Sequence, residues 1–157
     1  IGTTKKGIGP TYAAKIQRYG LRVGDLLDWD VFLQKYNRMG TFYPIRSEEN
    51  IQKELTELKT FRDLMMQKQM IVESVGWINR KFKENKRILI EGANATLLDI
   101  DLGTYPYVTS SSTSIGGVST GLGLSPDKVE SIIGVVKAYT TRVGEGPFPT
   151  ELKESIG

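Results

Sequence analysis

The sequence feature that most constrains this chain is a long apolar pattern with helical spacing between Ser47 and Phe82. Apolar side chains recur there in steps of three and four, which lines them up on one face of an α-helix and does not suit a strand. The positions are Ile51, Leu55, Leu58, Phe61, Leu64, Met65, Val72, Val75, Ile78 and Phe82. One helix of this length would be unusual, so we expect a break at 67–69 and two antiparallel helices.

Two shorter helices are expected before this pattern. The first covers 11–19 and ends at Gly20, which takes the position of a C′ glycine. The second begins after the N-cap residue Asp28 and ends at Gly40. Together with the long pattern, these helices predict that residues 21–86 form a helical segment.

Two short apolar runs outside the helical segment predict strands. Residues 87–91 and 132–139 are largely apolar, and each run leads into a glycine-rich polar segment, at 92–124 and at 140–147. An apolar run that follows a helix is typical of a buried parallel strand, and open α/β sheets bind ligands where such strands end. We therefore expect an α/β chain with a mostly parallel sheet, helices and an inserted helical segment.

The chain contains no cysteine and no histidine. Disulfides, thiolate nucleophiles and cysteine metal sites are therefore excluded, and so is a histidine general base. Acid–base chemistry within this chain would need Asp, Glu, Lys or Tyr. A net charge of +3 suits binding of anionic metabolites, but it is equally typical of an ordinary solvated surface. No apolar run approaches the ~20 residues that span a bilayer, so we expect no membrane segment.

The two ends of the chain predict that it is a piece of a longer protein. It opens with Ile1-Gly2-Thr3-Thr4, without an initiator methionine, and closes at Glu154-Ser155-Ile156-Gly157 without a terminal cap. The lack of a visible targeting segment therefore says little about location.

The opening loop at 2–10 has the composition of an anion site. It combines two threonines, Lys5, Lys6 and three glycines ahead of a helix. Glycines let backbone N–H groups approach a phosphate closely, and the helix dipole favours negative charge. The spacing of a Walker P-loop is absent, so phosphate binding and a plain glycine-rich helix entry both stay open.

A second polar segment carries six consecutive hydroxyl side chains at 109–114, followed by Ile115 and two glycines. Such a run can hydrogen-bond a phosphate or a ribose, or it can form an exposed flexible loop. Tyr105 and Tyr107 lie just before it and favour an anchored loop. The whole stretch at 92–124 shows little periodicity, and irregular segments of that length in compact domains are commonly functional.

Asp99 and Asp101 lie two residues apart. In an extended segment their side chains would face the same side and could hold a metal ion or orient a partner. Two carboxylates alone make a weak metal site, and a solvated or capping role is the alternative. We therefore assign no metal ligand within this chain.

Several of these segments resemble one known family. Residues 7–18 fit the pattern G-I-G-P-x-Y-x-x-K-x-x-R of the adenylosuccinate synthetase family. Further segments that resemble this family follow in the same order, at 91–94, 97–101, 103–111 and 137–144. The resemblance covers nearly the whole chain and is weakest over 28–86, while Leu102 and Ser112 depart from the family pattern.

The resemblance implies a P-loop-NTPase-like synthetase fold, with this chain as the central part of a single domain. Residues 1–20 would hold the phosphate loop and a helix, residues 21–86 the helical segment, and residues 87–157 the sheet and nucleotide-binding loops. The implied activity is GTP-dependent ligation of inosine monophosphate (IMP) and L-aspartate to adenylosuccinate, the first committed step of AMP synthesis. Mg²⁺ bound by residues outside this chain, a homodimer and a cytoplasmic location are implied as well.

The resemblance also implies site residues. Thr4 and Thr109 resemble residues that hydrogen-bond the 5′-phosphate of IMP, and Asn94 takes the place of the side chain that reads the hypoxanthine base. Val143 matches a backbone contact to the ribose, and Arg18 resembles an arginine that reaches the phosphate in the neighbouring subunit. The family's catalytic Asp and His belong to an N-terminal segment missing from this sequence. We therefore expect no catalytic residue here and no activity from this piece alone.

Two alternatives stay open. A non-catalytic nucleotide- or RNA-binding module would suit the basic isoelectric point and the lysines and arginines near the start of the chain. The aromatic residues, however, are not interleaved with basic ones as stacking platforms are, so we expect no nucleic acid partner. The other alternative is that the chain is a truncated, inactive relic.

Overall fold

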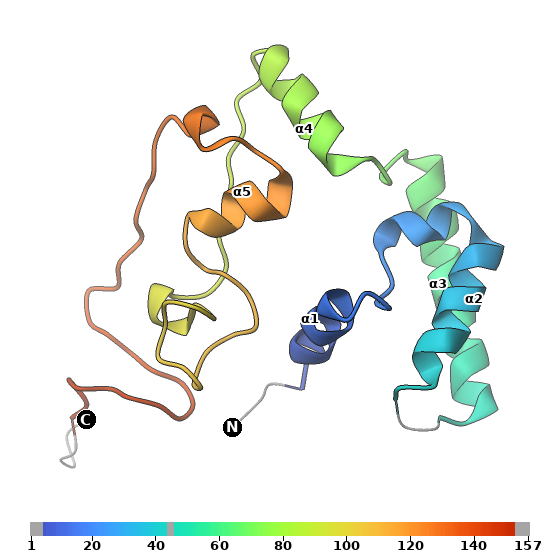
Figure 1. Ribbon diagram of the computed structural model, residues 1–157, viewed down its shortest axis with the longest axis horizontal. Helices are drawn as coiled ribbons and strands as arrows, with labels where there is room; N and C mark the ends of the chain where they lie inside the picture. Colours follow the sequence, from blue (N-terminus) through green and yellow to red (C-terminus); the bar gives the residue numbers. More distant parts are fainter. Residues whose placement is uncertain (1–4, 44–45, 153–157) are drawn as a thin grey trace. The chain divides into compact units, whose positions relative to one another are not determined.

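The computed structural model describes residues 5–43 and 46–152 of the chain (Figure 1). Its helices are α1 (Ile8–Ile16), η1 (Val23–Leu27), α2 (Trp29–Gly40), α3 (Glu48–Gln67), α4 (Ser74–Lys83), η2 (Thr96–Leu98), α5 (Gly116–Leu122) and η3 (Pro126–Lys128), where η marks a 3-10 helix. The chain divides into two compact units. One is formed by residues 10–80, and the other joins residues 81 onward to the segment before Pro10.

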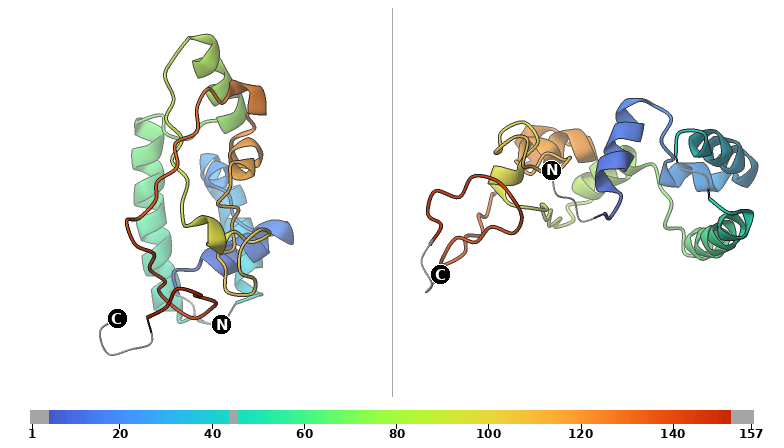
Figure 2. Two further views of the ribbon diagram at one scale, coloured as in Figure 1. Left: turned by 90° about the vertical axis from the view of Figure 1, so that its left-hand side faces the viewer. Right: turned by 90° about the horizontal axis from the view of Figure 1, so that it is seen from below.

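The unit of residues 10–80 has its core between η1, α2 and α3. Leu26, Phe32 and Tyr36 are buried at its centre. Partly buried apolar residues pack against them: Leu21, Trp29, Leu33, Ile51, Leu55, Leu58, Met65 and Ile71. Figures 1 and 2 show α2 and α3 side by side. Four of the apolar positions predicted in this part of the pattern, Ile51, Leu55, Leu58 and Met65, therefore pack on the core, whereas Phe61 and Leu64 of the same pattern are exposed.

Local signals in the sequence set the ends of α2 and α3. Asp28 caps α2, because its Oδ1 atom accepts hydrogen bonds from the backbone N–H groups of Asp30 and Val31, both at 3.0 Å. Ser47 caps α3 through a backbone N–H group three residues later, at 3.3 Å. The predicted cap at Asp28 and the predicted end at Gly40 are both confirmed.

The predicted break in the long helical pattern is confirmed, since α3 ends at Gln67 and α4 begins at Ser74. The antiparallel pairing expected for these helices is not seen among the described residues, where α3 packs on η1 and not along α4. Ile78 is buried in α4 but lies outside the core around Phe32. Among the helices of the described part, none has both the length and the apolar character of a membrane span.

α1 differs from the predicted helix at both ends, since it begins at Ile8 and ends at Ile16. The residue that turns left-handed after it is Arg18, with a φ of 67°, and not the predicted Gly20. Gly20 instead allows close packing, because an added Cβ would stand 3.1 Å from the backbone carbonyl carbon of Ala14. Its N–H group also donates to the Ala14 carbonyl oxygen at 3.1 Å.

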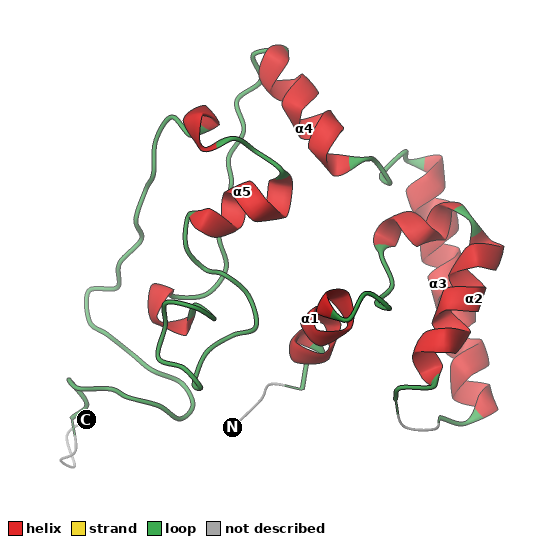
Figure 3. Ribbon diagram, viewed as in Figure 1, coloured by secondary structure: helices red, strands yellow, loops and turns green. Residues whose placement is uncertain are grey.

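The predicted parallel sheet is wrong for the residues that the structure describes, whose regular elements are all helical (Figure 3). The runs at 87–91 and 132–139 form no strand. Their side chains stay open to solvent, with Leu89 89% exposed and Val135 96% exposed. A strand requires a neighbour whose backbone groups pair with its own N–H and C=O groups. Neither run has such a neighbour within the described part, so β-branched composition alone does not produce a sheet.

α5 lies within 92–124, the stretch whose sequence shows little periodicity. The helix contains three glycines, which are poor helix formers. Gly123 ends it in the left-handed conformation, with a φ of 66°, and donates its N–H group to the Ser119 carbonyl oxygen at 3.0 Å. Leu124 follows and is buried. α5 therefore forms despite low intrinsic propensity, and it ends at a glycine whose conformation suits a helix terminus.

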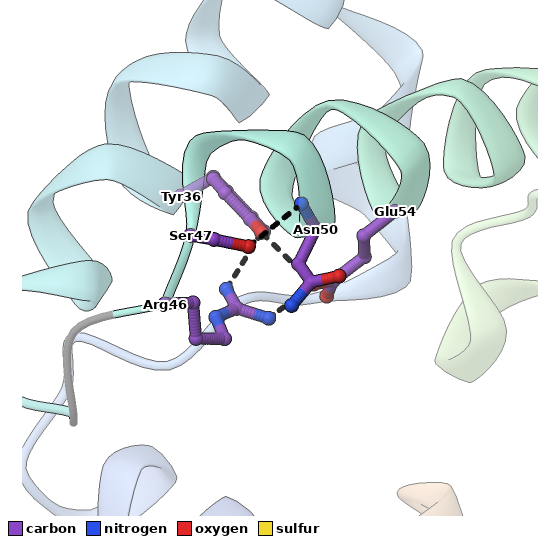
Figure 4. Close-up of polar contacts among 5 residues, drawn as sticks. All are labelled: Tyr36, Arg46, Ser47, Asn50 and Glu54. Atoms are coloured by element: carbon purple, nitrogen blue, oxygen red, sulfur yellow. Dashed lines mark hydrogen bonds and ion pairs between the residues drawn. The ribbon is translucent and has the colours of Figure 1, made fainter.

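A polar cluster links α2 to the start of α3 (Figure 4). The Tyr36 hydroxyl group donates to Glu54 Oε2 at 3.1 Å, and Arg46 Nη2 donates to the Tyr36 hydroxyl oxygen at 2.7 Å. Arg46 also forms an ion pair with Glu54 and lies over the Tyr36 ring, 5.7 Å from its centroid. Burial and the neighbouring Glu54 carboxylate raise the pKa of Tyr36. Tyr36 thus packs its ring in the core and uses its hydroxyl group to join the two helices.

Candidate functional site

The unit that contains residues 81–152 includes the most deeply buried carboxylate of the described chain, Asp99, which is 1% exposed. Its Oδ1 atom accepts hydrogen bonds from the backbone N–H groups of Asp101 and Leu102, at 2.9 and 3.0 Å. Gly103 closes this turn by donating its N–H group to the Asp99 carbonyl oxygen at 2.9 Å. A Cβ at Gly103 would stand 2.8 Å from the Asp99 nitrogen, so only glycine fits there. We name residues 96–104 the Asp99 turn.

The other carboxylate oxygen of Asp99 binds the run of six hydroxyl residues, 109–114, which we name the hydroxyl loop. Oδ2 accepts hydrogen bonds from the backbone N–H groups of Thr113 and Ser114, at 2.6 and 3.1 Å, and from Ser112 Oγ at 3.1 Å. The bonds from the backbone of the Asp99 turn, together with those from the hydroxyl loop, outweigh burial and hold the pKa of Asp99 well below its usual range. Asp99 is therefore a charged internal anchor.

These contacts decide between the two interpretations of Asp99 and Asp101. Asp99 lies in a turn, and both of its carboxylate oxygens accept hydrogen bonds from protein donors. Within residues 5–43 and 46–152, no group of three or more His, Cys, Asp or Glu side chains is arranged to hold a metal ion. Asp99 therefore caps backbone N–H groups, and both of its carboxylate oxygens already have protein donors.

Thr109 begins the hydroxyl loop and is fixed through its backbone. Its N–H group donates to the Leu98 carbonyl oxygen at 2.8 Å, and the Ile100 N–H group donates to the Ser111 carbonyl oxygen at 3.3 Å. These two bonds lie on either side of Asp99 in the sequence. The backbone at 109–111 is therefore held against the Asp99 turn.

The hydroxyl side chains of the loop divide into two groups. Those at 112–114 are bonded internally: Ser112 to Asp99 and Ser114, and Thr113 to the Ala95 carbonyl oxygen at 3.2 Å. The hydroxyl groups of Thr109, Ser110 and Ser111 form no hydrogen bond with another described residue. The first half of the loop therefore keeps its donors available for a ligand.

The glycine-rich opening segment lies beside this available half. A Cβ built on Gly9 would stand 3.5 Å from Ser110 Oγ, which is ordinary van der Waals contact. Gly7 has a φ of 79°, in the left-handed region that favours glycine. Thr4, predicted to bind phosphate from this segment, lies outside the described residues.

Arg142 ties a third segment to the same loops. Its Nη2 atom donates to the Tyr107 carbonyl oxygen at 3.0 Å and its Nη1 atom to Thr104 Oγ1 at 3.3 Å. Nε and Nη2 also donate to the Glu145 carbonyl oxygen, at 3.0 and 2.8 Å. Gly146 has a φ of 126°, and an added Cβ would overlap the guanidinium and the Tyr107 Cβ atom. The guanidinium thus closes the turn at 142–145 and ties it to Thr104 and Tyr107.

Three of the five predicted site residues belong to this connected set of loops. Asn94 is exposed, with a φ of 69°, and precedes Ala95, which the hydroxyl loop contacts. Thr109 opens the hydroxyl loop, and Val143, 99% exposed, follows Arg142. Arg18 belongs to the unit of residues 10–80. Their ligand contacts stay predictions.

The sequence predicts capping as one alternative for Asp99, and the structure has it in that role, but the sequence does not predict its bonds to the hydroxyl loop. Arg142 is placed by the sequence only within a family motif, at 137–144. The one local signal for Asp99 was the glycine four residues later, at Gly103, which marks a tight turn. Its partners in the hydroxyl loop lie up to 15 residues away and have no local signature.

Comparison with known proteins gives the same family along the whole chain. The sequence model of adenylosuccinate synthetase matches residues 1–157. A protein of that name from Paramecium tetraurelia is 59% identical over 161 aligned positions, which cover all of this chain and 37% of the relative. Another, from Schistosoma japonicum, is 56% identical with the same coverage.

A solved structure agrees with this match. The fully ligated adenylosuccinate synthetase from Plasmodium falciparum superposes with a TM-score of 0.90 at 44% sequence identity, covering 99% of this chain and 37% of that one. The chain thus spans 37% of the length of these relatives. With the family match extending over its full length, the chain belongs to the adenylosuccinate synthetase family.

Proposed function

We propose that this chain is part of a longer enzyme that ligates IMP and L-aspartate to adenylosuccinate at the expense of GTP, and that it supplies part of the IMP site. The family match supports the reaction. The observation that carries the IMP site is the available half of the hydroxyl loop: the hydroxyl groups of Thr109, Ser110 and Ser111 bond no other residue within 5–43 and 46–152, and their backbone is itself anchored.

The chemistry of this surface suits a phosphate monoester. A phosphate dianion is bound well by hydroxyl and backbone N–H donors, especially where they are already oriented. Thr109 and Ser110 provide such hydroxyl groups, and the glycine-rich segment around Gly9 allows a close approach of backbone. α1 starts in that segment, so the positive end of its dipole favours the same charge. We assign Thr4 and Thr109 to the 5′-phosphate.

The remaining assignments concern the base, the ribose and the second subunit. The Asn94 amide has both donors and an acceptor for the hypoxanthine edge, and the exposed backbone of Val143 can contact the ribose. Arg18 would reach the phosphate of the neighbouring subunit in a cytoplasmic homodimer. GTP is the co-substrate, and Mg²⁺ and the catalytic pair would be held by residues outside this chain.

The test uses the full-length enzyme with Thr109→Val, which removes one hydroxyl group and keeps the side-chain volume. We expect the KM for IMP to rise by at least about tenfold, since a hydrogen bond to a charged group contributes ~1.5–3 kcal/mol. The KM for GTP is expected to stay unchanged. Thr120→Val is the matched control, because the Thr120 hydroxyl group donates within α5, to the Gly116 carbonyl oxygen at 3.3 Å, and bonds no other described residue.

Two results would contradict the proposal. An unchanged KM for IMP in Thr109→Val would remove the phosphate role of this residue. A wild-type enzyme that forms no adenylosuccinate, but binds RNA with steep salt dependence, would favour the RNA-binding alternative.

A further inference from the structure

The division of the hydroxyl loop into two halves has a single structural cause. The internally bonded half turns its backbone N–H groups at Thr113 and Ser114 toward Asp99, at 2.6 and 3.1 Å. The available half begins where the Thr109 N–H group bonds Leu98, the residue before Asp99, at 2.8 Å. The buried carboxylate therefore lies where the hydroxyl loop meets the Asp99 turn.

We propose that Asp99 is a positioning residue for the substrate phosphate. It anchors the second half of the hydroxyl loop, so that the hydroxyl groups of Thr109–Ser111 are already ordered when the ligand binds. This role rests on the proposed IMP site and adds to it a residue that does not touch the substrate. A loop ordered before binding gives tighter binding, because the conformational entropy of ordering is not lost when the ligand arrives.

A carboxylate is the side chain that fits this task. Two backbone N–H groups of the Asp99 turn donate to Oδ1, and two of the hydroxyl loop donate to Oδ2, so both oxygens must be acceptors. In Asp99→Asn, the amide oxygen can keep the first pair, but the NH₂ group then faces the N–H groups of Thr113 and Ser114. Donor would oppose donor at a site that is 1% exposed, and the loop would have to move.

Asp28→Asn provides the matched control. The Oδ1 atom of Asp28 accepts from backbone N–H groups two and three residues later, as Oδ1 of Asp99 does. Among the described residues, the other carboxylate oxygen of Asp28 accepts no hydrogen bond from a second segment, and in the variant the amide oxygen can replace the Oδ1 acceptor. The same chemical change is therefore expected to have little effect at Asp28 and a large one at Asp99.

The experiment is steady-state kinetics on the full-length enzyme. For Asp99→Asn, the KM for IMP is expected to rise by at least about tenfold while the KM for GTP stays within about twofold. For Asp28→Asn, both constants are expected to stay within about twofold. A KM for IMP that is unchanged in a folded Asp99→Asn enzyme would overturn the positioning role.

A double variant separates positioning from a general loss of structure. If Asp99 acts through the hydroxyl loop, the double variant Asp99→Asn/Thr109→Val will raise the KM for IMP by less than the product of the two single fold-changes. Effects that multiply in full would overturn the role, because independent sites behave in that way. If Asp99→Asn does not fold, Ser112→Ala replaces it, because this variant removes one donor to Oδ2 of Asp99. We expect its KM for IMP to rise by about two- to fivefold. An unchanged KM for IMP would overturn the role.

The two proposals fail in different ways. If Thr109→Val leaves the KM for IMP unchanged, the IMP site itself is wrong. If Thr109→Val raises it and Asp99→Asn does not, the IMP site stands and the positioning role of Asp99 is rejected.

Discussion

The Arg142 guanidinium donates to the carbonyl oxygen of Tyr107 at 3.0 Å, across 35 residues of sequence. Tyr107 lies two residues before Thr109, and Val143 follows Arg142. A single side chain thus joins the segments proposed to contact the phosphate and the ribose of one nucleotide. Two glycines make the arrangement possible: at Gly103 and at Gly146 the neighbouring atoms leave no room for a Cβ atom, so a residue without one is required.

Arg142→Lys is expected to weaken IMP binding. An ammonium group cannot reproduce the planar set of donors that reaches Tyr107, Thr104 and Glu145 together. The KM for IMP measured on the full-length enzyme is expected to rise by about tenfold, the loss of one charged hydrogen bond or more. Arg38→Lys, an exposed arginine in the last turn of α2, is the control. Equal KM values for IMP in the two variants would contradict this role of Arg142.

Gly146→Ala is expected to lower the thermal midpoint of the full-length enzyme. Its φ of 126° is strained for any residue with a side chain, and the added Cβ would overlap Arg142 and Tyr107. Backbone strain of this kind costs about 1–3 kcal/mol, before any steric overlap is added. Gly40→Ala is the matched change at a helical glycine with open space around it, and it is expected to be neutral or stabilising.

Tyr36→Phe tests the link between α2 and α3 without changing the core. The variant keeps the buried ring and removes the hydroxyl group that bonds both Glu54 and Arg46. We expect a loss of about 1 kcal/mol in the free energy of unfolding, measured with denaturant, and unchanged kinetic constants. Tyr43→Phe is the comparison: its hydroxyl group makes a long, exposed bond of 3.4 Å to the Pro10 carbonyl oxygen and a contact with the Tyr19 hydroxyl group, and a smaller loss is expected. A loss at Tyr43 as large as at Tyr36 would argue against the cluster.

The Asp99 anchor also predicts a pH dependence. The pKa of Asp99 is lower in the folded chain than in the unfolded chain, where it is about 3.9. The stability that Asp99 contributes is therefore fully present above about pH 5, and it is lost progressively as the pH falls through the unfolded pKa toward the folded one. The stability difference between wild type and Asp99→Asn, from thermal midpoints at pH 3 to 8, is expected to be constant above about pH 5 and to narrow below pH 4. A difference that widens at low pH would contradict this assignment.

Local signals determined the helical part of the fold. Asp28 and Ser47 cap α2 and α3 because a side-chain oxygen reaches N–H groups two or three residues away. The break after α3 follows from the length of the apolar pattern. These interactions involve neighbours in the sequence, so the order of residues contains the information needed to predict them. The family motifs likewise identified the family, because each one is a local string of residues.

What only the tertiary structure decided depends on partners far apart in the chain. The apolar runs at 87–91 and 132–139 have the composition of strands, yet pairing requires a neighbouring backbone that the described residues do not provide. From the sequence, Asp99 could have been a metal ligand, a solvated residue or a cap, and the N–H group of Thr113, fourteen residues later, is a partner that only the tertiary structure supplies. The sequence determines which groups can donate and accept, and packing alone determines which of them meet.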